Sequence, residues 1–126
     1  MEVVTLDVPV VIGQIQSGNL VAIGVAANQR DAVLPDVPTL AEQGYPNTDA
    51  SNWYALLAPA KTPPDVIATL NKAVNDALND PALHDKLVKA GATPVGGTPQ
   101  SLGTFMKAEY DKWGRVVAEH GIKETQ

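Results

Sequence analysis

The sequence contains no cysteine, so disulfide bonds, thiol catalysis and cysteine–zinc sites are excluded. Its two histidines, His84 and His120, lack the spacing of a metal-binding pair on one helix face. No nucleophile–base pair can be recognised beside them, as an enzyme of the hydrolase type requires. The residues therefore predict a binding protein rather than an enzyme.

Basic residues are also few. Nine Lys and Arg stand against fourteen Asp and Glu, for a net charge of −5, which argues against nucleic acid or an anionic membrane as a partner. No apolar run approaches the roughly 20 residues that span a bilayer. Glu2 and Asp7 interrupt the opening and no basic segment precedes it, so it does not resemble a signal peptide. The leader of an exported parent is expected to lie outside this sequence.

What the sequence does contain is an alternation of short apolar runs and helical patterns, in a length that suits one domain. The order predicts an α/β fold with a parallel or mixed sheet and flanking helices. Buried strands are expected at Met1–Leu6, Leu20–Ala27 and Trp53–Ala58, with an edge or closing strand at Ala92–Val95. Helices are expected at Asp7–Ser17, at Pro38–Gln43, from a Thr62 cap to Asn79, from Asp80 to Gly91, and from Thr98 to Gly121.

Two strand–helix or strand-end positions are candidate ligand sites. At Asp7, Val8 and Pro9 a strand meets a helix, where unpaired backbone N–H groups suit a carboxylate. The carboxylate of Asp7 has an alternative role there, because as an N-cap it competes with an anion for the same donors.

The second candidate is Ser51, Asn52 and Trp53 at the head of the central strand. Polar groups and a large aromatic side chain beside a strand end are suited to lining a cleft. The alternative is that Trp53 and Tyr54 pack in the core.

Taken as a set, several motifs resemble the C-terminal part of tripartite tricarboxylate transporter receptors, the Bug-type solute-binding proteins. They are the segments 34–44 (LPDVPTLAEQG), 53–64 (WYALLAPAKTPP) and 91–95 (GATPV), with Leu70-Asn71, Asp80-Pro81 and Trp113. The segment 15–23 (IQSGNLVAI) precedes them in family order. The resemblance extends over nearly the whole chain.

The resemblance implies a partial type II periplasmic-binding-protein fold and a periplasmic receptor without cofactor or enzymatic activity. Such receptors close two lobes on a small carboxylate and deliver it to membrane transporter subunits. The carboxylate is held largely by backbone N–H groups and bridging waters. The departure from the family is at Leu6-Asp7, where members often carry aspartate and asparagine.

The resemblance further implies that residues 1–50 form the end of the second lobe and the crossover, and that residues 51–126 return to the first lobe. We therefore expect an incomplete receptor that binds carboxylates weakly or not at all. It is expected either to form a homo-oligomer through an exposed sheet edge or to complete its sheet in another way. The alternative is a stand-alone small α/β interaction domain without a transport role.

Overall fold

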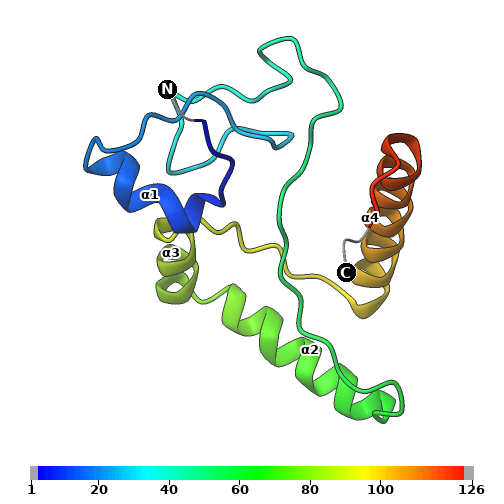
Figure 1. The fold of residues 1–126 in the computed structure, drawn as a ribbon. Coiled ribbons are helices and arrows are strands. Elements are labelled where there is room, and N and C mark those ends of the chain that lie inside the picture. The colour runs from blue at the N-terminus through cyan, green and yellow to red at the C-terminus, as the bar shows by residue number, and fades with distance from the viewer. Residues whose placement is uncertain (1–2, 124–126) are drawn as a thin grey trace.

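Four α-helices make up the regular structure of the chain in a computed structural model, which describes residues 3–123 (Figure 1). A proline stands in the first turn of every one of them, where its missing N–H has no partner to lose. Their positions confirm four of the five predicted helices. They are α1 (Val8–Gln16), α2 (Pro64–Leu78), α3 (Pro81–Lys89) and α4 (Pro99–His120).

The caps explain where the helices begin. The Asp80 side chain accepts a hydrogen bond from the Leu83 N–H at 2.9 Å at the start of α3. Thr98 and Ser101 form a reciprocal capping box at the start of α4. The predicted Thr62 cap is wrong, because Thr62 bonds back to the Pro59 carbonyl in a turn and the capping position of α2 falls on the next residue.

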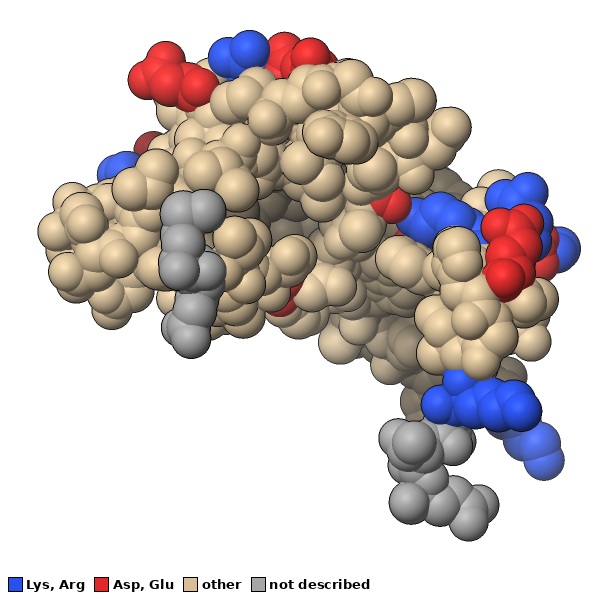
Figure 2. All heavy atoms as spheres, turned by 45° about the horizontal axis from the view of Figure 1, so that its top comes forward, with Lys and Arg blue, Asp and Glu red and all other residues tan. Residues whose placement is uncertain are grey.

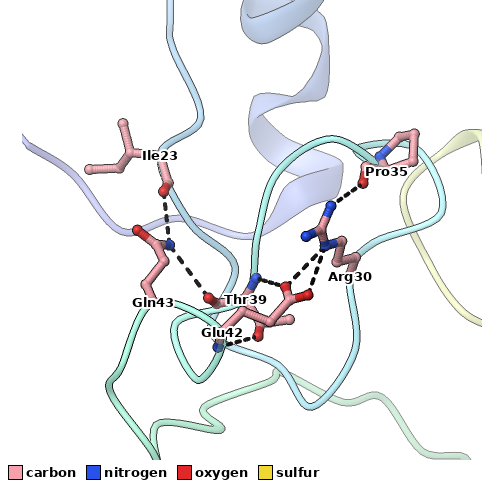
Figure 3. A network of polar contacts seen from close by, with 6 residues as sticks. All are labelled: Ile23, Arg30, Pro35, Thr39, Glu42 and Gln43. Atoms are coloured by element: carbon pink, nitrogen blue, oxygen red, sulfur yellow. Dashed lines mark hydrogen bonds and ion pairs between the residues drawn. The ribbon is translucent and has the colours of Figure 1, made fainter.

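The prediction of a helix at residues 38–43 is also wrong, because this segment forms turns. Thr39 and Glu42 nevertheless exchange hydrogen bonds as in a capping box: the Thr39 N–H donates to Glu42 Oε2 at 2.7 Å, and the Glu42 N–H donates to Thr39 Oγ1 at 3.1 Å. Arg30 reaches the same carboxylate, and the Gln43 amide donates to the Ile23 carbonyl (Figure 3). The segment therefore uses its capping groups to close a loop.

The four predicted strands are absent from the described residues, and Met1 and Glu2 of the first one lie outside them. One parallel bridge joins Val25 to Thr39. A parallel ladder needs a neighbouring strand for each row of N–H and C=O groups. Among the described residues the apolar segments 3–6, 20–27, 53–58 and 92–95 do not pair with one another, so they stay extended or irregular and form no sheet.

The described residues also lack a hydrophobic core: no apolar side chain is buried, and Thr39 is the one buried polar residue, 3% exposed. Segment 51–58 runs as extended chain from the loops toward α2, with α4 on one side and α1 and α3 on the other (Figure 1). Large apolar side chains of the described residues are therefore in contact with solvent.

A second polar network joins α2 to the turn before α4. The Asn75 side chain accepts from the Gly97 N–H at 2.8 Å and donates to the Gly97 carbonyl at 2.9 Å, where Asn71 also donates. Gly97 has a φ of 124°, which the absence of a Cβ permits. The glycine pair at 96–97 is thus part of a turn held by helix side chains.

Candidate functional site

The two segments predicted as ligand sites meet in the structure. Asn52 Nδ2 donates a hydrogen bond to Asp7 Oδ1 at 2.5 Å, although the residues lie 45 positions apart in the sequence. The Tyr54 hydroxyl donates to Asp7 Oδ2 at 3.5 Å. The carboxylate of Asp7 is therefore held by side chains from the extended segment that precedes α2.

This arrangement changes the expected role of Asp7. It occupies the N-cap position of α1, but its side chain makes no capping hydrogen bond. The Val10 and Val11 N–H groups donate to the Asp7 carbonyl instead, at 2.9 and 3.3 Å. The expectation that its carboxylate covers the helix donors is therefore wrong.

Of the three residues predicted at this helix start, Asp7 and Val8 each have a backbone N–H without a partner among the described residues. Val8 is half-buried, and its N–H has no hydrogen-bond partner among the described residues. Pro9 carries no N–H and supplies only the fixed backbone angle of the first turn. The backbone donors available at this helix start are therefore those of Asp7 and Val8.

Gly91, which sequence reasoning treated as a helix stop, completes this junction. A Cβ atom on Gly91 would lie 2.8 Å from Val8 Cγ1 and 3.2 Å from the Pro9 nitrogen. Its φ of 78° is also one that other residues rarely adopt. The glycine allows the end of α3 to approach the start of α1 closely. The sequence feature that could have identified this role is its position at the start of the 91–95 motif.

Ser51 differs from its neighbour, because its donors bond within the loop. Its hydroxyl donates to Asp49 Oδ1 at 2.8 Å and its N–H donates to the same oxygen at 3.3 Å. Asn28 donates to the other Asp49 oxygen at 3.0 Å. Ser51 thus stabilises the loop that leads to Asn52, and it makes no hydrogen bond to Asp7 among the described residues.

Trp53 packs against α4. Its ring meets the ring of Phe105 edge to face, with centroids 5.3 Å apart. The side chain still remains 40% exposed. Both interpretations of Trp53 thus keep some support: one edge packs on a helix, and the remaining surface is accessible beside Asn52.

α4 is also tied to the head of the extended segment by charge. Lys112 Nζ lies 3.5 Å from the Asp49 carbonyl and pairs with Glu109, to which the Trp113 indole N–H also donates. The bond from Lys112 is the main reason why the pKa of Glu109 lies below its usual value of 4.5. These groups position the segment at 49–53.

The described part of the chain holds no cluster of His, Asp and Glu suited to a metal ion. None of its helices combines the length and the apolar character needed to cross a membrane. The junction of Asp7, Val8, Asn52 and Trp53 presents hydrogen-bond donors and one carboxylate, a set suited to binding a polar organic molecule.

Two solved structures share this backbone. "R. palustris Rpa4515 with adipate" superposes with a TM-score of 0.82 at 30% identity, covering 91% of this chain and 38% of that one. A structure described as that of a periplasmic transporter gives a TM-score of 0.83 at 39% identity, covering 92% of this chain and 39% of that one. The backbone of this chain thus matches a little over a third of each of these two proteins.

Sequence relatives agree. Protein BugT of Bordetella pertussis is 41% identical over 117 residues, which cover 93% of this chain and 36% of BugT. The UPF0065 protein in the clcB-clcD intergenic region of Pseudomonas knackmussii is 36% identical over 113 residues, 89% of this chain and 67% of that protein. This chain therefore spans about a third of the length of BugT.

Residues 1–122 match the family described as "Tripartite tricarboxylate transporter family receptor", and this chain belongs to that family. The predicted resemblance is confirmed. The members of the family are transport receptors and not enzymes, in agreement with the prediction from the residues.

Proposed function

We propose that this chain forms part of an extracytoplasmic solute-binding receptor for small carboxylates, one that delivers its ligand to membrane transporter subunits. The proposal places the parent protein in the periplasm. It is supported by the family match, by the solved periplasmic transporter and by the structure of Rpa4515 with adipate. The match along residues 1–122 favours a receptor over a stand-alone interaction domain.

The observation that carries the site is the contact between Asn52 and Asp7 at the start of α1. In the proposal a ligand carboxylate accepts hydrogen bonds from the Val8 N–H and from Asn52, and Trp53 covers it from the side of α4. Pro9 and Ser51 shape the backbone on either side. Asp7 orients Asn52 and repels a ligand oxygen that approaches its own carboxylate.

The division of the chain follows the same proposal. Residues 1–50 close the second lobe and contain the crossover, and residues 51–126 return to the first lobe. The two polar networks described above fall on opposite sides of this boundary: Arg30, Thr39 and Glu42 on one side, Asn75 and Gly97 on the other. The Asn52–Asp7 bond crosses it.

The test is a titration followed by amide chemical shifts in nuclear magnetic resonance, because weak binding is expected from a partial site. Adipate is expected to shift the amide signals of Val8, Asn52 and Trp53 with a Kd on the order of 1 mM or weaker. Adipamide, which has the same length and no charge, is the control ligand. Citrate and glutamate test which acids the site accepts.

The matched variants are Asn52→Ala and Asn79→Ala, the second at the exposed end of α2. Asn52→Ala is expected to remove the adipate-dependent shifts, and Asn79→Ala is expected to keep them. Shifts that are equal for adipate and adipamide, or that appear elsewhere in the chain, would refute the site. The absence of any shift at adipate concentrations of about 50 mM, well above the expected Kd, would refute binding by this chain.

The proposal also includes a homo-oligomer of this chain, because large apolar side chains are exposed on its surface. Side chains such as Leu56 and Leu57, 71% and 65% exposed, tend to be covered by another molecule when the chain is alone in solution. Light scattering during size-exclusion chromatography is expected to give a mass above that of the 13.2 kDa chain. A monomer over the whole micromolar range would contradict it.

A further inference from the structure

Helix α4 carries different residues on its two sides. Its half-buried residues, among them Met106, Lys112 and Val116, recur at helical spacing and lie on the side that faces the rest of the chain. The other side carries charged residues spaced four apart, which places them in one row along the helix. This charged row consists of Lys107, Asp111, Arg115 and Glu119.

The charges of this row are open to solvent, because all four residues are exposed. Lys107 and Asp111 pair within the helix at 2.7 Å, with side chains that are 76% and 53% exposed. Neither Arg115 nor Glu119 forms an ion pair with any other described residue. Exposed pairs within a helix contribute little to its stability, so these charges remain available to another molecule.

A shallow hollow lies beside the charged row. Tyr110, Gly114 and Ala118 are among the residues that line it, and all of its lining residues belong to α4. A Cβ atom on Gly114 would meet no neighbouring atom within 4 Å, and the Tyr110 side chain is 80% exposed. Figure 2 shows charged side chains of both signs at the edge of the molecule where α4 lies. A second helix can therefore approach this side of α4 closely.

The order of the charges makes the row complementary to itself. Along the chain the signs are plus, minus, plus and minus, and reversing the direction gives minus, plus, minus and plus. In an antiparallel pair centred between Asp111 and Arg115, each charge of one copy therefore faces the opposite charge of the other. A parallel pair would place like charges opposite each other, which is unfavourable. The pattern thus selects a second, antiparallel copy of this chain as the occupant.

We propose that α4 forms an antiparallel pair with α4 of a second copy of this chain, through the charged row and the hollow beside it. Asp111 of each copy pairs with Arg115 of the other at the centre, and the outer charges of the row pair in the same way. Tyr110 of each copy packs against Gly114 of the other. A two-fold axis relates the two copies, so each contact occurs twice.

The inference goes beyond the homo-oligomer proposed from the apolar surface, and it does not depend on the carboxylate site. The α4 interface is selected by charge, so salt weakens it by screening. Leu56 and Leu57 lie outside α4, and association through such apolar side chains is not weakened by salt. The two kinds of association can therefore be separated by experiment.

The test is sedimentation velocity of the full chain, together with nuclear magnetic resonance of the α4 amides. A dimer with a Kd on the order of 100 µM is expected in about 50 mM NaCl, and one about 10-fold weaker in about 500 mM NaCl. The amide signals of Asp111 and Arg115 are expected to shift with protein concentration. The same measurements on the double variant Leu56→Asn, Leu57→Asn remove the apolar association and are expected to leave the α4 pair.

Charge reversals give a matched set of variants. Arg115→Glu and Asp111→Arg each place like charges at both central contacts and are each expected to weaken the dimer by about 10-fold or more. An equimolar mixture of the two variants is expected to form a heterodimer of about wild-type affinity, because two acidic side chains of one copy then face two arginines of the other. Lys61→Glu, in the exposed loop before α2, changes the net charge as Arg115→Glu does and is expected to leave the dimer unchanged.

A chain that stays monomeric up to about 1 mM would overturn the proposal, as would equal effects of Arg115→Glu and Lys61→Glu. Single reversals without effect would also overturn it, because a parallel pair or another surface would then hold the copies together. The adipate titration of Arg115→Glu is expected to match that of the wild type at the Val8 and Asn52 amides. Failure of either proposal therefore leaves the other to its own measurement.

Discussion

The loops at residues 23–45 and the extended segment 51–58 are both free of helix, yet they are held in opposite ways. The loops bond to themselves. Val25 donates to the Pro38 carbonyl at 3.0 Å and accepts from the Leu40 N–H at 2.9 Å, and Thr39 lies buried between them. Segment 51–58 has apolar side chains and open backbone groups among the described residues.

The two regions differ in the interactions that maintain their conformation. A loop whose donors and acceptors are satisfied by nearby side chains keeps its form within this chain. A strand that is apolar on both faces depends on neighbours that supply a ladder and a cover. Substitutions in the self-bonded parts should therefore change the stability of this chain, whereas those at the exposed Leu56 and Leu57 should change it little.

The largest loss is expected at the contact between α3 and α1. Gly91→Val introduces a Cβ 2.8 Å from Val8 Cγ1 at a φ of 78°. Strain and overpacking together are expected to cost about 2–4 kcal/mol, measured as faster amide exchange in α1 and α3. Gly13→Ala, in the open interior of α1, is the control and is expected to stabilise the helix by up to about 1 kcal/mol. Unchanged exchange in Gly91→Val would show that the two helices do not depend on this approach.

The network between α2 and the turn before α4 is expected to contribute less. Asn75→Ala removes both hydrogen bonds to Gly97, at 2.8 and 2.9 Å, and is expected to cost about 1–2 kcal/mol in the stability of α2. Lys72→Ala on the same helix breaks only the exposed ion pair with Asp76 and is expected to cost under about 0.5 kcal/mol. Thermal unfolding followed by circular dichroism measures both. Equal losses would mean that Gly97 is not held by the Asn75 side chain.

A smaller, pH-dependent effect is expected in the loops. The hydrogen bond from Arg30, followed by that from the Thr39 N–H, lowers the pKa of Glu42 below its usual 4.5. A carboxyl with a lowered pKa in the folded state stabilises above pH 4.5, and the stabilisation is lost as the pH falls through the lowered value. Titration of the Glu42 carboxyl carbon by nuclear magnetic resonance is expected to give a midpoint below 4.5. Arg30→Gln should move it back up; a midpoint that stays in place would exclude the ion pair in solution.

Local signals predicted the helices well. Proline in the first turn, with Asp80 and Thr98 as caps, fixed the starts of α3 and α4, because capping acts between residues close in sequence. The same local signals misplaced a helix at 38–43. There the Thr39 and Glu42 capping groups are present, but the segment closes on Val25 and Arg30 from a distant part of the chain.

The outcome for the strands could not be predicted from local signals, because strand pairing depends on segments far apart in the sequence. Apolar composition at 53–58 indicates what the segment prefers, whereas a ladder depends on which backbone lies beside it. At the site, sequence reasoning named Asp7 and Asn52 separately, and their contact came only from the fold. Gly91 was missed as a neighbour of this junction, because its role depends on a close backbone approach. The contact of Tyr54 with Asp7, across 47 residues, likewise came only from the fold.

The smallest effect on stability is expected from a substitution of Leu57, an apolar residue in a segment with the composition of a buried strand. Leu57 is 65% exposed in segment 51–58, whereas Leu40 packs against Gly24 in the self-bonded loops. Leu57→Asn is expected to change the free energy of unfolding of this chain by less than about 0.5 kcal/mol, because no buried contact is lost. Leu40→Asn should cost about 1–2 kcal/mol and speed exchange at the Val25 and Leu40 amides. If Leu57→Asn already unfolds the isolated chain, segment 51–58 is covered from within and the contrast between the two regions does not hold.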